Sequence, residues 1–251
     1  LLGNSLSEIA KNKLGILNEA VQTVVGSRWP EEVQEEIQIA QRQYPFHWVE
    51  PKAVSVFVEK EETGPRYYLH SQWGTTENAL PGKRGAECAA LALSVFETLG
   101  FEPQHYLSTL KSVRWPGRME RFEVEGKQIF LSGDHNVLGV QSLLELLQNY
   151  SYKKLHALVG IGKNKDKEGM LSEFKKIPHL SLHLTQSPFQ GIAIEEYGKW
   201  VSQASGLWRD PIQGLQTLIR QSKKDDLILV TGSLYLVGQV RAFLSSSDSG
   251  L

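Results

Sequence analysis

The sequence is poor in cysteine and has no excess of charge of either sign. Cys88 is the only cysteine among 251 residues, so no disulfide can form within the sequence and no set of thiolate metal ligands is available. We therefore expect a reducing, cytoplasmic setting. The 27 basic and 28 acidic side chains give a formal net charge of −1, which provides no electrostatic footprint for nucleic acid or an anionic membrane.

Long apolar runs and a secretory leader are absent from the sequence as well. No stretch reaches the roughly 20 consecutive apolar residues that a membrane helix needs. The first residues mix apolar side chains with Asn4, Glu8 and Lys11, which is unlike a signal peptide. We expect a soluble protein without a membrane partner. Because the sequence opens at Leu1 and not at methionine, we also expect a fragment whose beginning is missing.

Complete nucleotide-binding fingerprints are not found either. The phosphate loop Gly-x-x-x-x-Gly-Lys-Ser/Thr does not occur, and we expect any such loop to lie before Leu1. The stretch Gly160–Lys163 has two glycines at the spacing of a dinucleotide fingerprint but lacks the third, and Asp166 follows too closely. No nucleotide-binding prediction rests on these loops alone.

The first half of the sequence predicts a mixture of helices and short strands. Ser5 precedes apolar residues at helical spacing and can cap a helix, and Pro30 with two glutamates suits the first turn of a second helix that ends near residue 44. The other predicted elements are strands at 21–25, 54–58 and 67–69 and helices at 82–99 and 103–113.

The segment Trp115-Pro116-Gly117-Arg118 is the best candidate for an internal boundary, because proline restricts the residue before it and glycine frees the backbone after it. We expect a first domain at 1–114, a hinge at 115–118, a second domain at 119–245 and a solvated tail at 246–251. In the second domain strands and helices alternate, which predicts a doubly wound α/β fold with a mostly parallel sheet. Its predicted strands are 121–124, 128–131, 155–161, 181–185 and 227–231, and its predicted helices are 137–150, 167–176, 192–204, 211–222 and 234–244.

Three polar loops of the second domain follow predicted strands, namely Ser132–Asn136, Gly160–Asp166 and Thr231–Ser233. Each loop by itself is better explained by ordinary turn and cap chemistry. Together they favour a site for an anionic ligand, because the carboxyl ends of parallel strands meet at one edge of the sheet. Asp134 and His135 form a titratable pair in the first of these loops.

Two cations have both an ordinary and a functional interpretation. Lys13 lies on the otherwise apolar stripe of the first helix, where it either extends into water or is held in a low-dielectric pocket that makes its amine a nucleophile. Arg118 either lies on the surface or binds a phosphate at the boundary between the two lobes. From the residues alone, the ordinary interpretation of Lys13 is favoured.

Several motifs in order along the sequence resemble the folylpolyglutamate synthase/dihydrofolate synthase family, which is similar to the Mur ligases. The resemblance covers nearly the whole sequence, and consecutive motifs at family-like spacing are more specific than any one of them. The motifs are Leu2-Gly3-Asn4-Ser5, Ile9-Ala10, Lys13-Leu14-Gly15-Ile16, Trp115–Glu120, Gly133–Asn136, Lys163–Asp166, Gly169-Met170-Leu171 and Asp226–Tyr235.

The resemblance implies part of a central ATPase domain, without its phosphate loop, followed by a Rossmann-like ligase domain. It implies a monomeric enzyme that uses ATP and Mg²⁺ to phosphorylate the carboxylate of a folate or dihydropteroate, which the amine of L-glutamate then attacks. Because the phosphate loop is missing, we expect these residues alone to be inactive.

The resemblance also implies roles for particular residues. Lys13 would be carbamylated and bind Mg²⁺, a role that reverses the preference stated above and that requires a partly desolvated amine. Arg118 would contact the ATP phosphates, and His135 would face the nucleotide. Lys13 and His135 are the predicted catalytic residues. The predicted nucleotide-binding residues are Arg84, Arg118, Ser132, Asp134 and His135.

Two loops depart from the family pattern and keep other functions open. Ser132, Asp134 and Val137 replace an Asp, an Ala and a Pro, and Arg84, Gly85 and Cys88 replace a His, a Gln and an Asn. One alternative is another Mur-type amino-acid ligase of cell-wall synthesis. The second is a degenerate nucleotide- or metabolite-binding module without catalysis.

Overall fold

A computed structural model describes residues 3, 5–27, 29–61 and 64–247. Leu2 and Asn4 of the first motif and residues 248–251 of the expected tail lie outside the described residues. The chain divides into two compact units. The first comprises Leu1–Phe57, Tyr67–Ala79 and Lys83–Ser112, and the second comprises Val58–Arg66, Leu80–Gly82 and Val113–Leu251. Among the described helices, none has both the length and the apolarity to cross a membrane.

The first unit begins with two helices that alternate with two short strands, α1 (Leu6–Leu14), β1 (Thr23–Val25), α2 (Glu31–Gln43) and β2 (His47–Val49). The predicted cap of α1 is confirmed, since Ser5 Oγ accepts a hydrogen bond from the Glu8 N–H at 3.1 Å. The predicted start of α2 after Pro30 is also confirmed. β1 and β2 pair in parallel, and Leu17, Ile37 and Phe46 form the core of this part.

The rest of the first half contains a three-stranded sheet with order β3-β4-β5, a helix and a 3₁₀ segment. Leu69 of the sheet packs with three residues of the helix and with Leu107. The strand β5 was not predicted, and the short helix expected at 103–113 is a 3₁₀ helix. The bounds are β3 (Val54–Glu61), β4 (Gly64–Ser71), β5 (Gly74–Glu77), α3 (Gly82–Thr98) and η1 (Pro103–Ser112).

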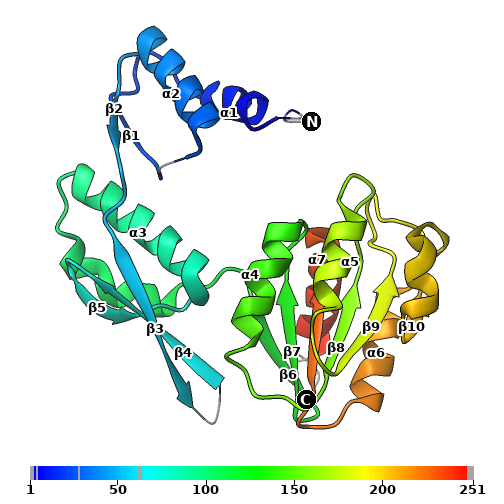
Figure 1. Ribbon diagram of the computed structural model, residues 1–251. Helices are drawn as coiled ribbons and strands as arrows, with labels where there is room; N and C mark the ends of the chain where they lie inside the picture. The colour runs from blue at the N-terminus through cyan, green and yellow to red at the C-terminus, as the bar shows by residue number, and fades with distance from the viewer. Residues whose placement is uncertain (1–2, 4, 28, 62–63, 248–251) are drawn as a thin grey trace. The chain divides into compact units, whose positions relative to one another are not determined.

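The second unit is a doubly wound α/β fold, as predicted (Figure 1). Its six-stranded sheet has the order β10-β9-β8-β11-β7-β6, and all neighbours are parallel except the antiparallel pair β6 and β7. The strands are β6 (Glu120–Val124), β7 (Lys127–Ser132), β8 (Leu155–Val159), β9 (Leu180–Thr185), β10 (Gly206–Trp208) and β11 (Leu227–Thr231).

Helices cover both faces of this sheet. The core on one face includes side chains of α4 (Val137–Leu147), α5 (Lys167–Phe174) and η2 (Ile194–Gln203). The core on the other includes side chains of α6 (Pro211–Gln221) and α7 (Leu234–Ser247). β8 and β11 are buried at every position, which explains their continuous apolar sequences.

Three local predictions for the second unit are wrong. The helix expected at 192–204 is a 3₁₀ segment whose backbone leaves the helical region at Gly198, with φ of 60°. The strand β10 was missed because it has only three residues. The last helix continues to Ser247 and does not end at Leu244.

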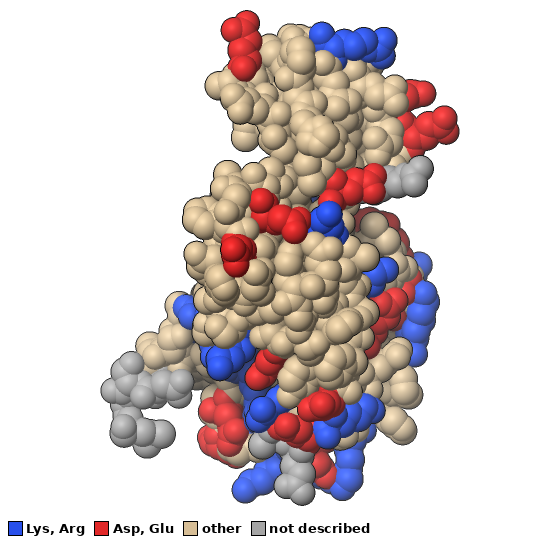
Figure 2. All heavy atoms as spheres, turned by 90° about the vertical axis from the view of Figure 1, so that its left-hand side faces the viewer, with Lys and Arg blue, Asp and Glu red and all other residues tan. Residues whose placement is uncertain are grey.

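On the face drawn in Figure 2 acidic and basic side chains are interspersed, in keeping with the balanced composition.

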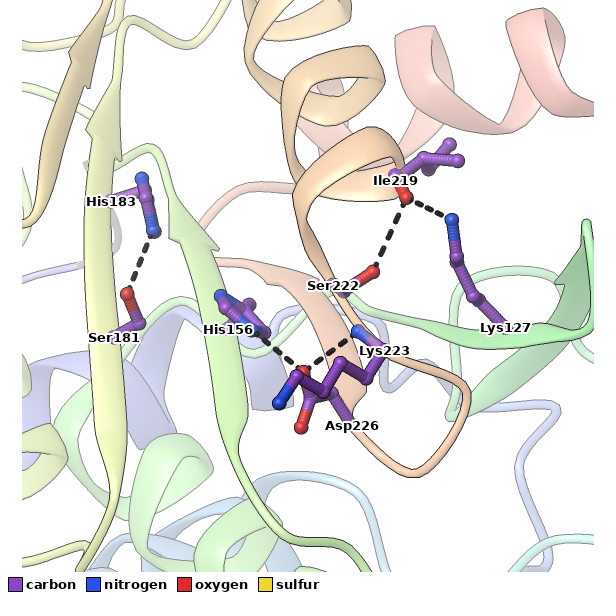
Figure 3. Close-up of polar contacts among 8 residues, drawn as sticks. All are labelled: Lys127, His156, Ser181, His183, Ile219, Ser222, Lys223 and Asp226. Carbon is purple, nitrogen blue, oxygen red and sulfur yellow. Dashed lines mark hydrogen bonds and ion pairs between the residues drawn. The ribbon is translucent and has the colours of Figure 1, made fainter.

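A buried polar cluster joins side chains of the neighbouring strands β8 and β9 with Asp226, the residue just before β11 (Figure 3). His156 Nε2 is 3.4 Å from Asp226 Oδ2, and among the buried side-chain nitrogen and oxygen atoms of the described residues its Nδ1 alone has no hydrogen-bond partner. His183 Nδ1 accepts a hydrogen bond from Trp208 Nε1, so the ring is neutral and its Nε2 donates to Ser181 Oγ at 3.1 Å. No sequence pattern pointed to this cluster.

Burial holds both rings in their neutral form. It lowers the pKa of His183 to about 4, and the neighbouring His156 and Lys154 act in the same direction. Burial also lowers the pKa of His156, although Asp226 opposes that shift. Because the unfolded chain takes up these protons at a higher pH than the folded chain does, the pair destabilises the fold below pH 6.5.

We predict that the free energy of unfolding falls as the pH is lowered from 7 to 5, by on the order of 1 kcal/mol per pH unit below the unfolded pKa of His183. His183→Gln reduces this slope because Gln takes up no proton. Urea denaturation at pH 7 and pH 5 measures both effects. His179→Asn is the matched control, because His179 is exposed, and asparagine tolerates its left-handed backbone. Equal slopes for the His183 variant and the wild type would contradict the prediction.

Candidate functional site

The three predicted loops of the second unit meet at the carboxyl edge of the sheet. They follow β7, β8 and β11, and β11 lies between the other two. The Gly160 N–H donates to the Thr231 carbonyl at 3.1 Å, and the Gly232 N–H donates to the Asp134 carbonyl at 3.1 Å. Backbone hydrogen bonds therefore join the three loops into one surface, which confirms the predicted convergence.

The loop Ser132–Asn136 is held by its own polar groups. Ser132 is buried, and its Oγ donates to Asp134 Oδ2 at 2.7 Å. His135 Nδ1 lies 2.9 Å from the Gly133 carbonyl, which can only accept, so Nδ1 carries the proton and Nε2 is left as an acceptor. Asn136 caps α4, with its Oδ1 accepting from the Gly139 N–H at 2.7 Å. The loop thus presents His135 from a fixed backbone.

Arg118 lies against this loop. A Cβ placed on Gly133 would clash with Leu234 Cδ2 and come within 3.1 Å of Arg118 Nη1, so the Leu234 side chain and the guanidinium both pack beside Gly133. The two segments are also joined through the backbone, since the Gly133 N–H donates to the Gly117 carbonyl at 2.8 Å. The structure therefore brings together the predicted residues Arg118, Ser132, Asp134 and His135.

This arrangement suits an anionic group. Arg118 is exposed and carries a permanent positive charge with donors in a planar fork. The amino end of α4, which the same loop leads into, adds the positive end of a helix dipole. A phosphate or a carboxylate bound beside Arg118 at this loop would meet both.

The loop Gly160–Asp166 has an ordinary turn and cap role. Asp166 caps α5, with its Oδ1 accepting from the Gly169 N–H at 2.8 Å. The Lys163 N–H donates to the Gln190 carbonyl at 2.8 Å. The interpretation of Gly160–Lys163 as a turn and not a dinucleotide fingerprint agrees with these contacts.

A fourth loop, which follows β9, contributes to the same edge and was not predicted. Ser187 is buried, and its Oγ donates to Ser233 Oγ at 2.9 Å. The rings of Phe189 and Tyr235 lie 4.6 Å apart, and about half of each side chain is exposed. The Ser187-Pro188 pair directly after a predicted strand was the available signal, because such polar turns mark the carboxyl ends of strands.

Lys13 and Arg84 belong to the first unit. Lys13 lies in the last turn of α1 and is exposed, so the expectation of a partly desolvated amine is wrong for the described structure. The apolar stripe fails to bury it because α1 ends at Leu14 and Leu6 is 47% exposed. Arg84 is exposed in the first turn of α3.

The described residues contain no group of three or more His, Cys, Asp or Glu side chains that could hold a metal ion. The side chains around Lys13 therefore do not supply a Mg²⁺ ligand set. The described carboxylates of the candidate surface, Asp134 and Asp166, do not belong to such a group either.

Comparison with known proteins places the candidate surface in a known kind of domain. Residues 117–234 match the model of the Mur ligase, glutamate ligase domain. The chain is 26% identical to the dihydrofolate synthase/folylpolyglutamate synthase of Bacillus subtilis, over 96% of this chain and 59% of that protein. It is 25% identical to the folylpolyglutamate synthase of Lacticaseibacillus casei, over 99% of this chain and 60% of that protein.

Solved structures support the fold. The Mycobacterium tuberculosis folylpolyglutamate synthase complexed with ADP superposes with a TM-score of 0.77 at 20% identity, over 97% of this chain and 60% of that one. The folylpolyglutamate synthase of Thermotoga maritima gives a TM-score of 0.72 at 24% identity, over 98% of this chain and 59% of that one. The chain therefore spans about 60% of the length of these relatives.

The fold, the family model and the relatives agree. Residues 117–234 match the Mur ligase, glutamate ligase domain, and the chain is similar over almost its whole length to folylpolyglutamate synthases and a dihydrofolate synthase/folylpolyglutamate synthase.

Proposed function

We propose that the protein is an ATP-dependent ligase that forms an amide bond between L-glutamate and the carboxylate of a folate or dihydropteroate. The observation that carries the proposal is the Arg118 guanidinium against Gly133, at the carboxyl edge of a domain that matches the glutamate ligase model. The similarity to a dihydrofolate synthase/folylpolyglutamate synthase supports the choice of substrates. The similarity to a folylpolyglutamate synthase complexed with ADP supports the use of ATP.

The proposed reaction has two steps. A carboxylate resists attack by an amine, so the terminal phosphoryl group of ATP is first transferred to a carboxylate oxygen, giving an acyl phosphate and ADP. The glutamate nitrogen then attacks the carbonyl carbon, the carbon–oxygen bond to phosphate breaks, and the nitrogen loses a proton as the amide forms. Charge accumulates on phosphate oxygens in both steps, which is where a fixed cation lowers the barrier.

The residues of the candidate surface have distinct proposed roles. Arg118, which lies beside Gly133, contacts the phosphate groups. Ser132 and Asp134 hold the loop, and His135 faces the nucleotide with Nε2 as an acceptor. We propose Arg84 as a further nucleotide contact, on the resemblance of its helix start alone.

The resemblance extends this proposal to the domains and the setting. Residues 1–114 correspond to the later part of the ATP-binding domain, 115–118 to the hinge and 119–245 to the ligase domain. We propose a monomer that acts in the cytoplasm, for which the single cysteine is the supporting observation. Because the described side chains do not form a Mg²⁺ ligand set, no step is assigned to this ion.

The decisive assay measures ATP- and L-glutamate-dependent amide formation by the protein at its full natural length. Dihydropteroate and tetrahydrofolate are offered as separate acceptors, and the product is detected by mass. Turnover with either acceptor supports the proposal. Turnover only with a cell-wall precursor would replace it with another Mur-type ligase, and nucleotide binding without any turnover would replace it with a binding module.

We predict that Arg118→Ala raises the dissociation constant for ATP by about tenfold, or 1.4 kcal/mol, because one charged phosphate contact is lost. Arg118→Lys keeps the charge but loses the planar fork, so its effect is smaller in the same direction. Arg121→Ala is the matched control, since Arg121 pairs with Glu123 within the same strand, β6. Isothermal titration calorimetry measures the constants, and wild-type affinity in Arg118→Ala would exclude a phosphate contact.

We predict that Lys13→Ala in the full-length protein lowers the turnover number by about tenfold, or 1.4 kcal/mol of barrier. The resemblance to the family alone supports a catalytic role for Lys13, because the described structure leaves its amine exposed. Lys11→Ala serves as the control, since Lys11 lies in the same turn and has only a 4.0 Å ion pair with Glu36. Steady-state rates measured at saturating Mg²⁺ test this prediction, and an unchanged rate would show that Lys13 has no role in turnover.

A further inference from the structure

The turn that carries Arg118 has an unusual backbone. Gly117 and Met119, on either side of Arg118, both have positive φ, 70° and 50°. Such a conformation is costly for methionine and persists only where neighbouring contacts enforce it. The Arg118 N–H donates to the Trp115 carbonyl at 3.2 Å, which closes the turn. Other contacts must therefore fix the turn in place.

Both the backbone N–H and the backbone carbonyl of Gly117 are hydrogen-bonded. Its N–H donates to Glu120 Oε2 at 2.9 Å, and its carbonyl accepts from the Gly133 N–H at 2.8 Å. The first bond ties the turn to the start of β6. The second ties it to the loop that holds His135. The position of Gly117 thus sets the distance between Arg118 and that loop.

Glu120 is in turn held by α7. Arg241 Nε donates to Glu120 Oε1 at 2.9 Å and lies 3.0 Å from Oε2. The Glu120 side chain is only 21% exposed, which strengthens a charge-assisted bond relative to one in open water. α7 also packs on the turn directly, because a Cβ on Gly117 would meet Val237 Cγ1 at 2.8 Å, one helical turn before Arg241.

We propose that Glu120 and Arg241 are positioning residues that hold Arg118 against Gly133. The Glu120 carboxylate accepts from both the Gly117 N–H and the Arg241 guanidinium, so it links α7 to the turn. Without that carboxylate the positive-φ turn loses its partner and relaxes, and Arg118 leaves the loop. The positioning of Arg118 follows from the contacts alone, whereas its consequence for phosphate binding rests on the proposed function.

The first test needs no ligand and reads individual amides by hydrogen exchange. In Glu120→Ala and Arg241→Met we expect the Gly117 and Gly133 amides to exchange about tenfold faster, because local opening of the turn exposes both. Amides of β8 and β11, at the centre of the sheet, stay at wild-type rates and show that the fold is intact. Unchanged exchange at both glycines in both variants would overturn the proposal.

The matched control is Glu123→Gln, which removes a carboxylate from the same strand. Glu123 is exposed and pairs with Arg121 at 3.6 Å, without contact to the turn. We expect wild-type exchange at Gly117 and Gly133 in this variant. Acceleration equal to that of Glu120→Ala would show a general effect of the strand and would overturn the proposal.

A reversed pair separates positioning from simple stabilisation. Glu120→Arg with Arg241→Glu can rebuild an ion pair, but an arginine at 120 has no acceptor for the Gly117 N–H. We expect the fold stability to recover while Gly117 exchange stays about tenfold faster than in the wild type. Recovery of both the fold stability and the protection of the Gly117 amide would show that the ion pair acts without the bond to Gly117, which would overturn the proposal. Arg241→Lys keeps the charge and should restore most of the protection.

The second test measures ATP binding in the same variants by calorimetry. We expect Glu120→Ala and Arg241→Met each to raise the dissociation constant for ATP by about fivefold, compared with about tenfold for Arg118→Ala. In a double variant with Arg118→Ala, we expect either change to raise the constant little further, because both act through Arg118. Full additivity with Arg118→Ala would overturn the link to phosphate binding. If the wild type binds no ATP, the proposed function fails, and the exchange result still decides the positioning role.

Discussion

The hydrogen bond from the Gly133 N–H to the Gly117 carbonyl is the contact on which the candidate surface depends. It joins the turn before β6 to the loop after β7, and both segments are glycine at the point of contact. A side chain at Gly133 would clash with Leu234 and crowd Arg118 Nη1, so a glycine at this position allows both residues to pack against the loop. The charge and the backbone donors of the site are brought together by this one close approach.

The rest of the second unit keeps that contact rigid. β8 and β11 are fully buried, and their parallel ladders hold the ends of the strands in register. Hydrogen bonds between the loops continue this order past the strand ends, from Gly160 to Thr231 and from Gly232 to Asp134. A site that binds phosphate needs this rigidity, because its donors must be aligned before the ligand arrives.

The histidines of the second unit differ in their surroundings. The carboxyl edge exposes Arg118, and in the neutral ring of His135 it leaves Nε2 as an acceptor. Within the sheet His156 and His183 are buried, and desolvation keeps them neutral. The histidines near the buried strands thus affect stability in acid, whereas the histidine on the loop is available for chemistry.

The sequence by itself determined the order and type of most elements, because caps such as Ser5 and Asn136 and continuous apolar strands act over a few neighbouring residues. It also located three of the loops at the carboxyl edge. Only the tertiary structure decided that Arg118 lies against Gly133, that Ser187 meets Ser233, and that Lys13 is exposed. Those outcomes depend on contacts between residues far apart in the chain, such as Arg241 with Glu120, which no local pattern encodes.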